Sequence, residues 1–238
     1  MVEAGSFPGS LALPSRPSRA EIVGVLLAVM ATVAVLAAVD GFKPWISPDT
    51  AGYLDVPPLP AGWGRPRHPL FGWVLGALPG RDFALVPAVQ TGLFLGGAVV
   101  LWRSLRRFGL SARAGAALLA ALLGSNLLAV WHAAVHPEMA AVALTLFALA
   151  FAVRLATPGA GVAGNVLGAA VALGLAYALR PSLLPAIVLL PALVALLGRL
   201  RGTRRALSRA AILLVACATP FLANAAIRLQ AVGDFNIV

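Results

Sequence analysis

The residues that could perform chemistry are concentrated in one segment, residues 40–70, which lies between two long apolar runs. This segment holds three of the eight acidic residues of the chain, two tryptophans and seven prolines. Its acidic and basic or histidine side chains are Asp40, Asp49, Asp55, Lys43, Arg65, Arg67 and His68. Carboxylates can take a proton from a hydroxyl group, and guanidinium groups can bind a phosphate. A polar loop stiffened by proline between hydrophobic spans is where we expect chemistry at a membrane surface.

The first candidate, Asp49, lies in the stretch SPDTAGYL. Ser47 or Asp49 could cap a short helix that also carries Tyr53 and Asp55, because both capping side chains accept hydrogen bonds from backbone N–H groups. Two interpretations are open. Asp49 is either that cap or a base that acts on a substrate.

The second candidate, Glu138, follows Pro137 at the start of a later apolar run, in HPEMAAVAL. Proline at the first helical position and an acid in the first turn are ordinary features of a helix start. The alternative is that Glu138 points from that helix start into the same cavity as Asp49. His132 and His136 are four residues apart, which predicts that they share one helical face, and with Glu138 they could bind a divalent metal. Their spacing matches no metalloenzyme motif, so neither a metal nor another cofactor is indicated.

The third candidate is Arg180, which interrupts two apolar runs in AYALRPSLLP. It is either an arginine that extends to the membrane interface or a ligand for a lipid phosphate. The same choice applies to Arg65, Arg67 and His68 in GRPRHPLFG, which are either solvated loop residues or a cradle for a phosphate.

Composition identifies the elements that must position these residues. Hydrophobic residues make up 61% of the 238 residues and charged residues 11%, with a mean hydropathy of +0.93. Soluble domains contain about 45–50% apolar and about 25% charged residues, so the chain is predicted to be a polytopic membrane protein. The net charge of +10 comes from short basic clusters between apolar runs rather than from one basic face, and no nucleic-acid partner is expected. The single cysteine, Cys217, excludes an intrachain disulfide and is expected to be a buried thiol.

Seven apolar runs have lengths suited to membrane spans. They cover residues 22–39, 83–102, 114–135, 137–155, 161–179, 182–197 and 206–229. Residues 71–78 are too short to cross and are expected to lie along the interface or to re-enter, whereas residues 1–20 are expected to be disordered. We therefore predict an all-α polytopic bundle of about seven transmembrane helices, with a long first outer loop, 40–82, that carries short interfacial helices. Asn126 and Asn224 are expected to form hydrogen bonds between helices.

The distribution of charge predicts the orientation of this bundle. With the N-terminus in the cytoplasm, the inner segments hold 12 Lys and Arg residues and the outer segments hold six. Six of the eight acids also fall on the outer side. The first loop, the turn at His136 and Arg180 would then share the outer face of a membrane, which we expect to be the inner (plasma) membrane of a bacterium.

In order along the chain, the motifs SPDTAGYL, RHPLFGWVLGAL, HPEMAAVALTLFALAFAVRL and ALRPSLLP resemble the N-terminal membrane module of the GT-C glycosyltransferases. Within that superfamily, residues 20–238 are most similar to the branch of the protein mannosyltransferases and the lipid A aminoarabinose or galacturonosyl transferases. The resemblance lies in order and topology more than in a tight signature. Members of the family usually have further spans and often a soluble outer domain, so it implies a fragment or a minimal version.

The resemblance implies roles for individual residues. The catalytic acid of the first outer loop matches Asp49, and a second acid at the outer start of a later span matches Glu138. A basic residue before a proline matches Arg180, and Arg65, Arg67, His68 and Tyr53 are further candidates for substrate binding.

The implied reaction moves a sugar from a polyprenyl-phosphate donor to a hydroxyl of a lipid, glycan or protein acceptor. Asp49 would remove the acceptor proton, while Arg180, with Arg65 or Arg67, would stabilise the phosphate that leaves. Apolar faces of the spans would hold the polyprenyl tail. Two alternatives from other classes remain, namely a transporter of lipids or solutes and a non-catalytic membrane scaffold. Against the transporter, no clear inverted repeat or charge pair at the membrane midplane is visible in the sequence.

Overall fold

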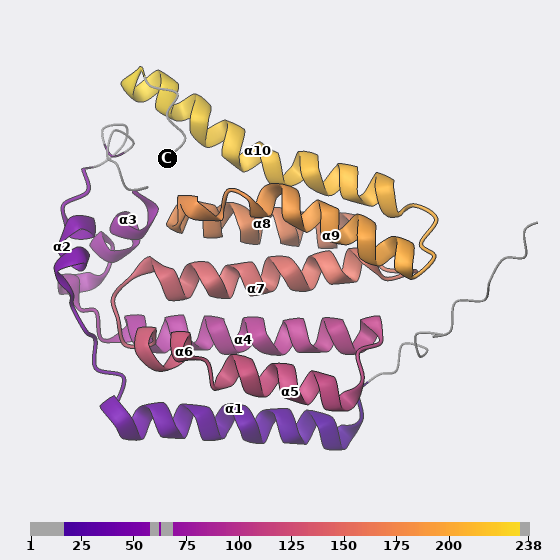
Figure 1. Cartoon of the computed structure of the whole chain (residues 1–238). Helices are drawn as coiled ribbons and strands as arrows, with labels where there is room; N and C mark the ends of the chain where they lie inside the picture. Colours follow the sequence, from indigo (N-terminus) through magenta and orange to yellow (C-terminus); the bar gives the residue numbers. More distant parts are fainter. Residues whose placement is uncertain (1–16, 58–61, 63–68, 234–238) are drawn as a thin grey trace, which may run out of the picture.

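The computed structural model describes residues 17–57, 62 and 69–233, and these residues form a bundle of long, roughly parallel helices (Figure 1). The long helices are α1 (Arg19–Asp40), α4 (Leu85–Phe108), α5 (Ala112–Leu123), α7 (Pro137–Ala156), α8 (Val162–Leu179), α9 (Ala186–Leu200) and α10 (Ala206–Val232). The short elements are α2 (Pro48–Leu54), α3 (Leu70–Gly76), η2 (Pro79–Arg81), α6 (Asn126–Trp131) and η3 (Pro181–Leu183). Seven helical segments are long and apolar enough to cross a membrane, when α5 and α6 are counted together and η3 is counted with α9. The predicted all-α polytopic bundle is confirmed.

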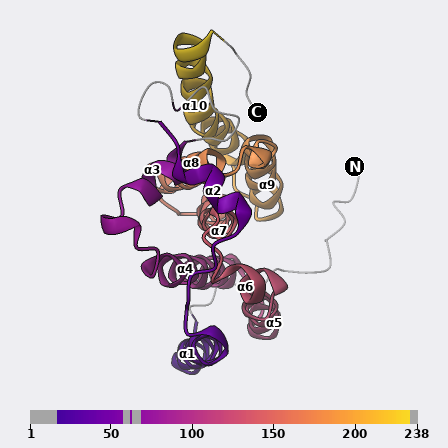
Figure 2. The same ribbon diagram turned by 90° about the vertical axis from the view of Figure 1, so that its left-hand side faces the viewer.

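Helix α7 lies at the centre of the bundle, with α4 and α8 beside it (Figure 2). Its alanines Ala148, Ala150 and Ala152 have no exposed surface, and small side chains let neighbouring helices approach closely. Gly97 of α4 illustrates this, since a Cβ atom there would lie 2.9 Å from the carbonyl oxygen of Ala143. The central position of α7 fixes the place of its first turn, which carries Glu138.

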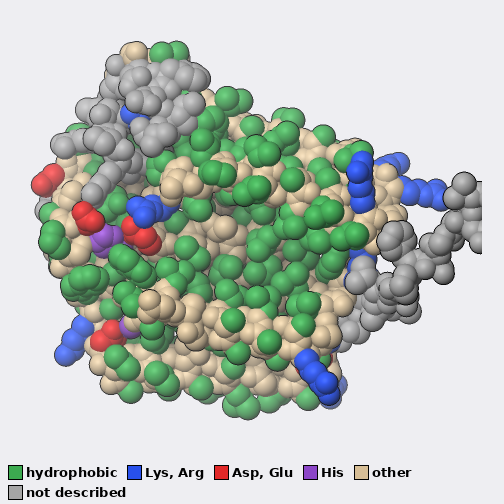
Figure 3. Space-filling view, viewed as in Figure 1, with side chains coloured by type: hydrophobic (Ala, Val, Ile, Leu, Met, Phe, Trp, Pro, Cys, Tyr) green, Lys and Arg blue, Asp and Glu red, His purple; other side chains and the backbone are tan. Residues whose placement is uncertain are grey.

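The connections divide the bundle into two ends. The loop end carries residues 41–57, 62 and 69–84, and α4, α7 and α9 begin there (Figure 1). The arginine end carries the connections 109–111, 157–161 and 201–205. Figure 3 shows acidic and histidine side chains at the loop end, an apolar middle, and basic side chains at the other end. The predicted alternation of spans is confirmed, whereas the side that faces the cytoplasm stays a prediction.

Two predicted boundaries are wrong. Helix α1 already begins at Arg19, because Ser18 and Glu21 form a reciprocal capping box, so the last two residues of the segment predicted to be disordered, 1–20, are helical. Residues 1–16 of that segment lie outside the described residues. The predicted span 114–135 is interrupted, since α5 ends at Leu123, Gly124 follows it, and Ser125 caps a new helix, α6. Helix α6 ends at Trp131, so His132 and His136 do not share a helical face.

Candidate functional site

The helix α2 of the first loop begins with a capping box. The Ser47 hydroxyl accepts a hydrogen bond from the backbone N–H of Thr50 at 3.3 Å, and the Thr50 hydroxyl accepts one from the N–H of Ser47 at 3.0 Å. Of the two capping residues that the sequence allowed, Ser47 is therefore the one used. Asp49 lies in the first turn of α2 with its residue exposed. An acid at that position is stabilised by the partial positive charge of the helix start and needs no capping role.

Helix α2 is docked on the segment that leads into α7. The backbone of Trp45 donates to the carbonyl of Ala133 at 2.8 Å and accepts from the N–H of Val135 at 3.0 Å. The hydroxyl of Thr50 donates to the carbonyl of Val135 at 3.2 Å, and both residues are fully buried. From the other side, the side-chain amide of Gln90 on α4 donates to the carbonyl of Ala134 at 3.0 Å. These bonds hold α2 and the residues before it against the segment that leads to Glu138.

A chain of polar contacts joins three elements at the loop end. The Oγ of Ser47 lies 2.5 Å from Nε2 of His136, and Nδ1 of the same ring lies 3.1 Å from Oε2 of Glu138. The other carboxylate oxygen of Glu138, Oε1, lies 3.1 Å from Nη1 of Arg180, which is the residue that ends α8. The side chains of His136 and Glu138 are 6% and 18% exposed, whereas that of Arg180 is 45% exposed. The contact between Glu138 and Arg180 brings together two residues that the sequence had singled out separately.

A carboxylate only accepts hydrogen bonds, so Nδ1 of His136 is assigned as the donor to Glu138. With the proton of the neutral ring on Nδ1, His136 donates to the Glu138 carboxylate and accepts the hydroxyl proton of Ser47. The order Ser–His–carboxylate is that of a serine nucleophile with its base. Acyl transfer also needs donors for an oxyanion, yet Pro48 has no N–H and the N–H of Ser47 is bonded to Thr50. The array is therefore better suited to holding Glu138 and α2 in place than to attacking an acyl group.

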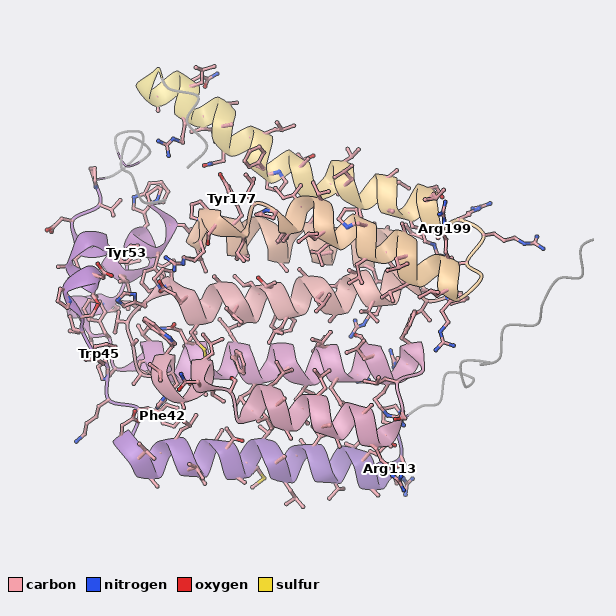
Figure 4. All side chains as sticks on the ribbon, viewed as in Figure 1. Phe42, Trp45, Tyr53, Arg113, Tyr177 and Arg199 are labelled. Carbon is pink, nitrogen blue, oxygen red and sulfur yellow. The ribbon has the colours of Figure 1, made fainter. Side chains whose placement is uncertain are left out.

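Aromatic rings enclose His136. The ring centroids of Trp131 and Tyr53 lie 5.6 Å and 6.3 Å from that of His136. Tyr53 also packs edge-to-face on Phe71 of α3, with centroids 5.3 Å apart. Tyr53, a predicted substrate-binding residue, is only 6% exposed and points into this cluster (Figure 4). The predicted residues Arg65, Arg67 and His68 lie outside the described residues.

The other buried histidine, His132, belongs to a separate contact. Its Nε2 lies 2.8 Å from Oδ2 of Asp40 at the end of α1, and its ring meets the edge of Phe42. His132 and His136, which were predicted to share one helix face, thus have different carboxylate partners, Asp40 and Glu138. Within the described part of the chain, no three His, Cys, Asp or Glu side chains lie close enough together to hold a metal ion.

An apolar groove runs along the outer surface between α8 and α10. It consists of two adjoining cavities of about 590 and 420 Å³, which share Ala170, Val171 and Pro220. The helices α8 and α10 approach closely at Gly174, where a Cβ atom would lie 3.0 Å from the Pro220 side chain. Towards the loop end the groove is lined by Trp73 of α3 and by Ala178, which is two residues before Arg180.

Polar residues accompany the loop-side part of the groove. Asn224 of α10 donates to the hydroxyl of Tyr177 on α8 at 3.3 Å, which confirms the predicted interhelical role of Asn224 (Figure 4). One helical turn beyond Asn224 is Arg228, which lies within electrostatic reach of Tyr177. The Nε of Arg228 is buried without a hydrogen-bond partner among the described residues. In the sequence, this position shows only a basic residue in an apolar run.

Comparison of this chain with family models, curated proteins and solved structures gave no match.

Proposed function

We propose that the protein is a membrane glycosyltransferase that moves a sugar from a polyprenyl-phosphate donor to a hydroxyl acceptor at the loop end. The observation that carries the proposal is the pairing of Glu138 with a half-exposed Arg180, which follows two residues after Ala178, a lining residue of the loop-side part of the apolar groove. A polyprenyl phosphate has two parts, an anionic head and a long apolar tail. A guanidinium group and an apolar groove are the protein features that would bind these two parts.

The residues have distinct roles in this proposal. The acceptor hydroxyl oxygen attacks the anomeric carbon of the sugar, and the bond from that carbon to the phosphate oxygen breaks. Asp49, exposed at the start of α2, takes the hydroxyl proton. Arg180 and Arg228 stabilise the charge that develops on the departing phosphate. Glu138 orients Arg180 and is itself held by His136.

The proposal extends to the location of the protein. Seven apolar spans indicate an integral membrane protein. The loop end holds five of the six described acids, all except Glu21, and the connections at the other end are rich in arginine (Figure 3). On the positive-inside rule, the arginine end faces the cytoplasm and the loop end faces the periplasm of a bacterial inner membrane.

The first test measures the binding of undecaprenyl phosphate, a polyprenyl phosphate of the class that the proposed transfer would release, to the chain in nanodiscs. A charge-assisted contact contributes about 1.5 to 3 kcal/mol, so Arg180→Ala should weaken binding about 10-fold or more, and Arg180→Lys less. Arg228→Ala should weaken it as well. Arg204→Ala, at the opposite end of the bundle, is the matched control and should bind normally. Equal affinity of all four variants and the wild type would refute the phosphate site.

The second test measures transfer with a panel of polyprenyl-phosphate sugars. Asp49→Asn keeps the size of the side chain and removes the base, so transfer should fall about 100-fold or more while undecaprenyl phosphate still binds. Asp55→Asn, at the other end of α2, is the control. If Asp49→Asn and the wild type transfer at the same rate, Asp49 is not the base.

A further inference from the structure

A second group of cations lies at the arginine end, away from the candidate site. Arg103 and Arg107 are exposed and are four residues apart on α4, which places them on one helical face. Within the described residues, neither guanidinium has a hydrogen bond or an ion pair. Their neighbour Arg106, in contrast, binds Glu21 of α1 through Nε at 2.8 Å. Arg103 and Arg107 are thus available to an anionic ligand.

These two arginines line a cavity of about 270 Å³ between α4 and α1. The other lining residues are apolar: Pro17, Ile22, Val25, Leu26, Val99 and Trp102. The cavity therefore combines two cationic groups with a hydrocarbon-like interior. It lies at the end of a membrane span, where the head group of a phospholipid would be found.

The cavity exists because α1 packs weakly on the rest of the bundle. Val25 and Leu36 are the buried residues of α1. Two polar contacts join α1 to the rest of the bundle, the ion pair of Glu21 with Arg106 at the arginine end and the contact of Asp40 with His132 at the loop end. Cavities border α1 on two sides. One is the cavity against α4, and a further cavity of about 290 Å³ lies between α1 and α5.

We infer that the cavity between α1 and α4 binds an anionic phospholipid, whose phosphate contacts Arg103 and Arg107 and whose acyl chain fills the seam between the two helices. The phosphate matches the charge of the two arginines, and the chain matches the apolar walls. A free phosphate would match the arginines alone and leave the walls uncovered. This lipid site is independent of the proposed transfer reaction, because it lies at the opposite end of the bundle.

The experiment titrates the whole 238-residue chain in a neutral detergent with phosphatidylglycerol and counts bound lipids by native mass spectrometry. Each arginine near an anionic head group contributes about 1 kcal/mol, or about fivefold in affinity, so Arg103→Gln/Arg107→Gln should weaken binding about 25-fold. The matched control, Arg204→Gln/Arg205→Gln, removes the same charge from exposed positions at the same end and should leave the affinity unchanged. Phosphatidylcholine should bind wild type weakly, and soluble glycerol 3-phosphate should not compete.

A second variant tests the apolar part of the site. Val99→Phe places a larger side chain in the cavity wall and keeps both arginines, so phosphatidylglycerol should bind more weakly although the charge is unchanged. Three results would each overturn the inference: undiminished binding by Arg103→Gln/Arg107→Gln, an equal loss in the control pair, or competition by glycerol 3-phosphate as strong as that by the lipid. The melting temperature without lipid serves to exclude variants that do not fold.

Discussion

Replacing His136 by leucine should loosen the loop helix α2 without unfolding the bundle. Leucine fills most of the space between Tyr53 and Trp131 but makes neither of the two hydrogen bonds of the imidazole. Glu138 keeps its contact with Arg180, so its carboxylate is not left without a charged partner. The direct loss for α2 is the bond between Ser47 and the ring.

The size of this effect follows from the number of anchors that hold α2. A hydrogen bond between uncharged groups contributes about 1 kcal/mol, which corresponds to about a fivefold change in the equilibrium between docked and undocked helix. The backbone bonds of Trp45 and the bond from Thr50 to Val135 remain in the variant. We therefore expect amide hydrogens in residues 50–54 to exchange about fivefold faster, rather than with the speed of an unfolded peptide.

Hydrogen exchange followed by mass spectrometry in nanodiscs measures this change. The matched control is His132→Leu, which removes the other buried histidine and its contact with Asp40. That variant should speed exchange at the end of α1 and leave α2 as in wild type. Two results would refute the role of His136 in holding α2 in place. One is an unchanged amide exchange rate of α2 in His136→Leu, and the other is an equal increase of that rate in both variants.

Three further outcomes are expected. A maleimide that does not cross membranes should label Ala51→Cys from the outside, and Arg204→Cys only after the membrane is opened; the reverse pattern would invert the orientation. Gly72→Ala should lower the melting temperature and separate α2 from α3, because a Cβ atom there would lie 2.4 Å from the carbonyl oxygen of Tyr53; a variant as stable as wild type would contradict the close approach. Arg209→Met should cost about 1 to 3 kcal/mol of unfolding free energy in a denaturant titration, because its guanidinium donates to two carbonyls at the end of α7; a change below about 0.5 kcal/mol would show that water replaces it.

The spans could be predicted from the sequence because each is a long apolar run, and lipid leaves the backbone few alternatives to a helix. The same reasoning predicted that Glu138 and Arg180 lie at the same depth in the membrane, since Glu138 begins one span and Arg180 ends the next one. Whether two residues at one level touch depends on how the helices pack sideways. That packing comes from small residues such as Gly97 and Gly174, whose contacts are with helices distant in sequence.

The errors have the same physical origin. The break at Gly124 interrupts a run that remains apolar on both sides, so hydropathy alone cannot reveal it. The contact from Ser47 to His136 joins residues that are 89 positions apart, and nothing in the spacing of either residue indicates the other. The buried Nε of Arg228 is likewise visible only when α8 and α10 are seen together.

The weak attachment of α1 bears on the order in which the chain is assembled in the membrane. Glu21 and its partner Arg106 are 85 residues apart, so at about 5 to 20 residues per second a ribosome needs about 4 to 17 s to make the second after the first. During that interval α1 must reside in the bilayer as a solitary helix. The surface of α1 is apolar nearly all round, so lipid can surround the single helix. Its acids Glu21 and Asp40 lie at its two ends, where head-group water can solvate them until α4 and α6 are inserted.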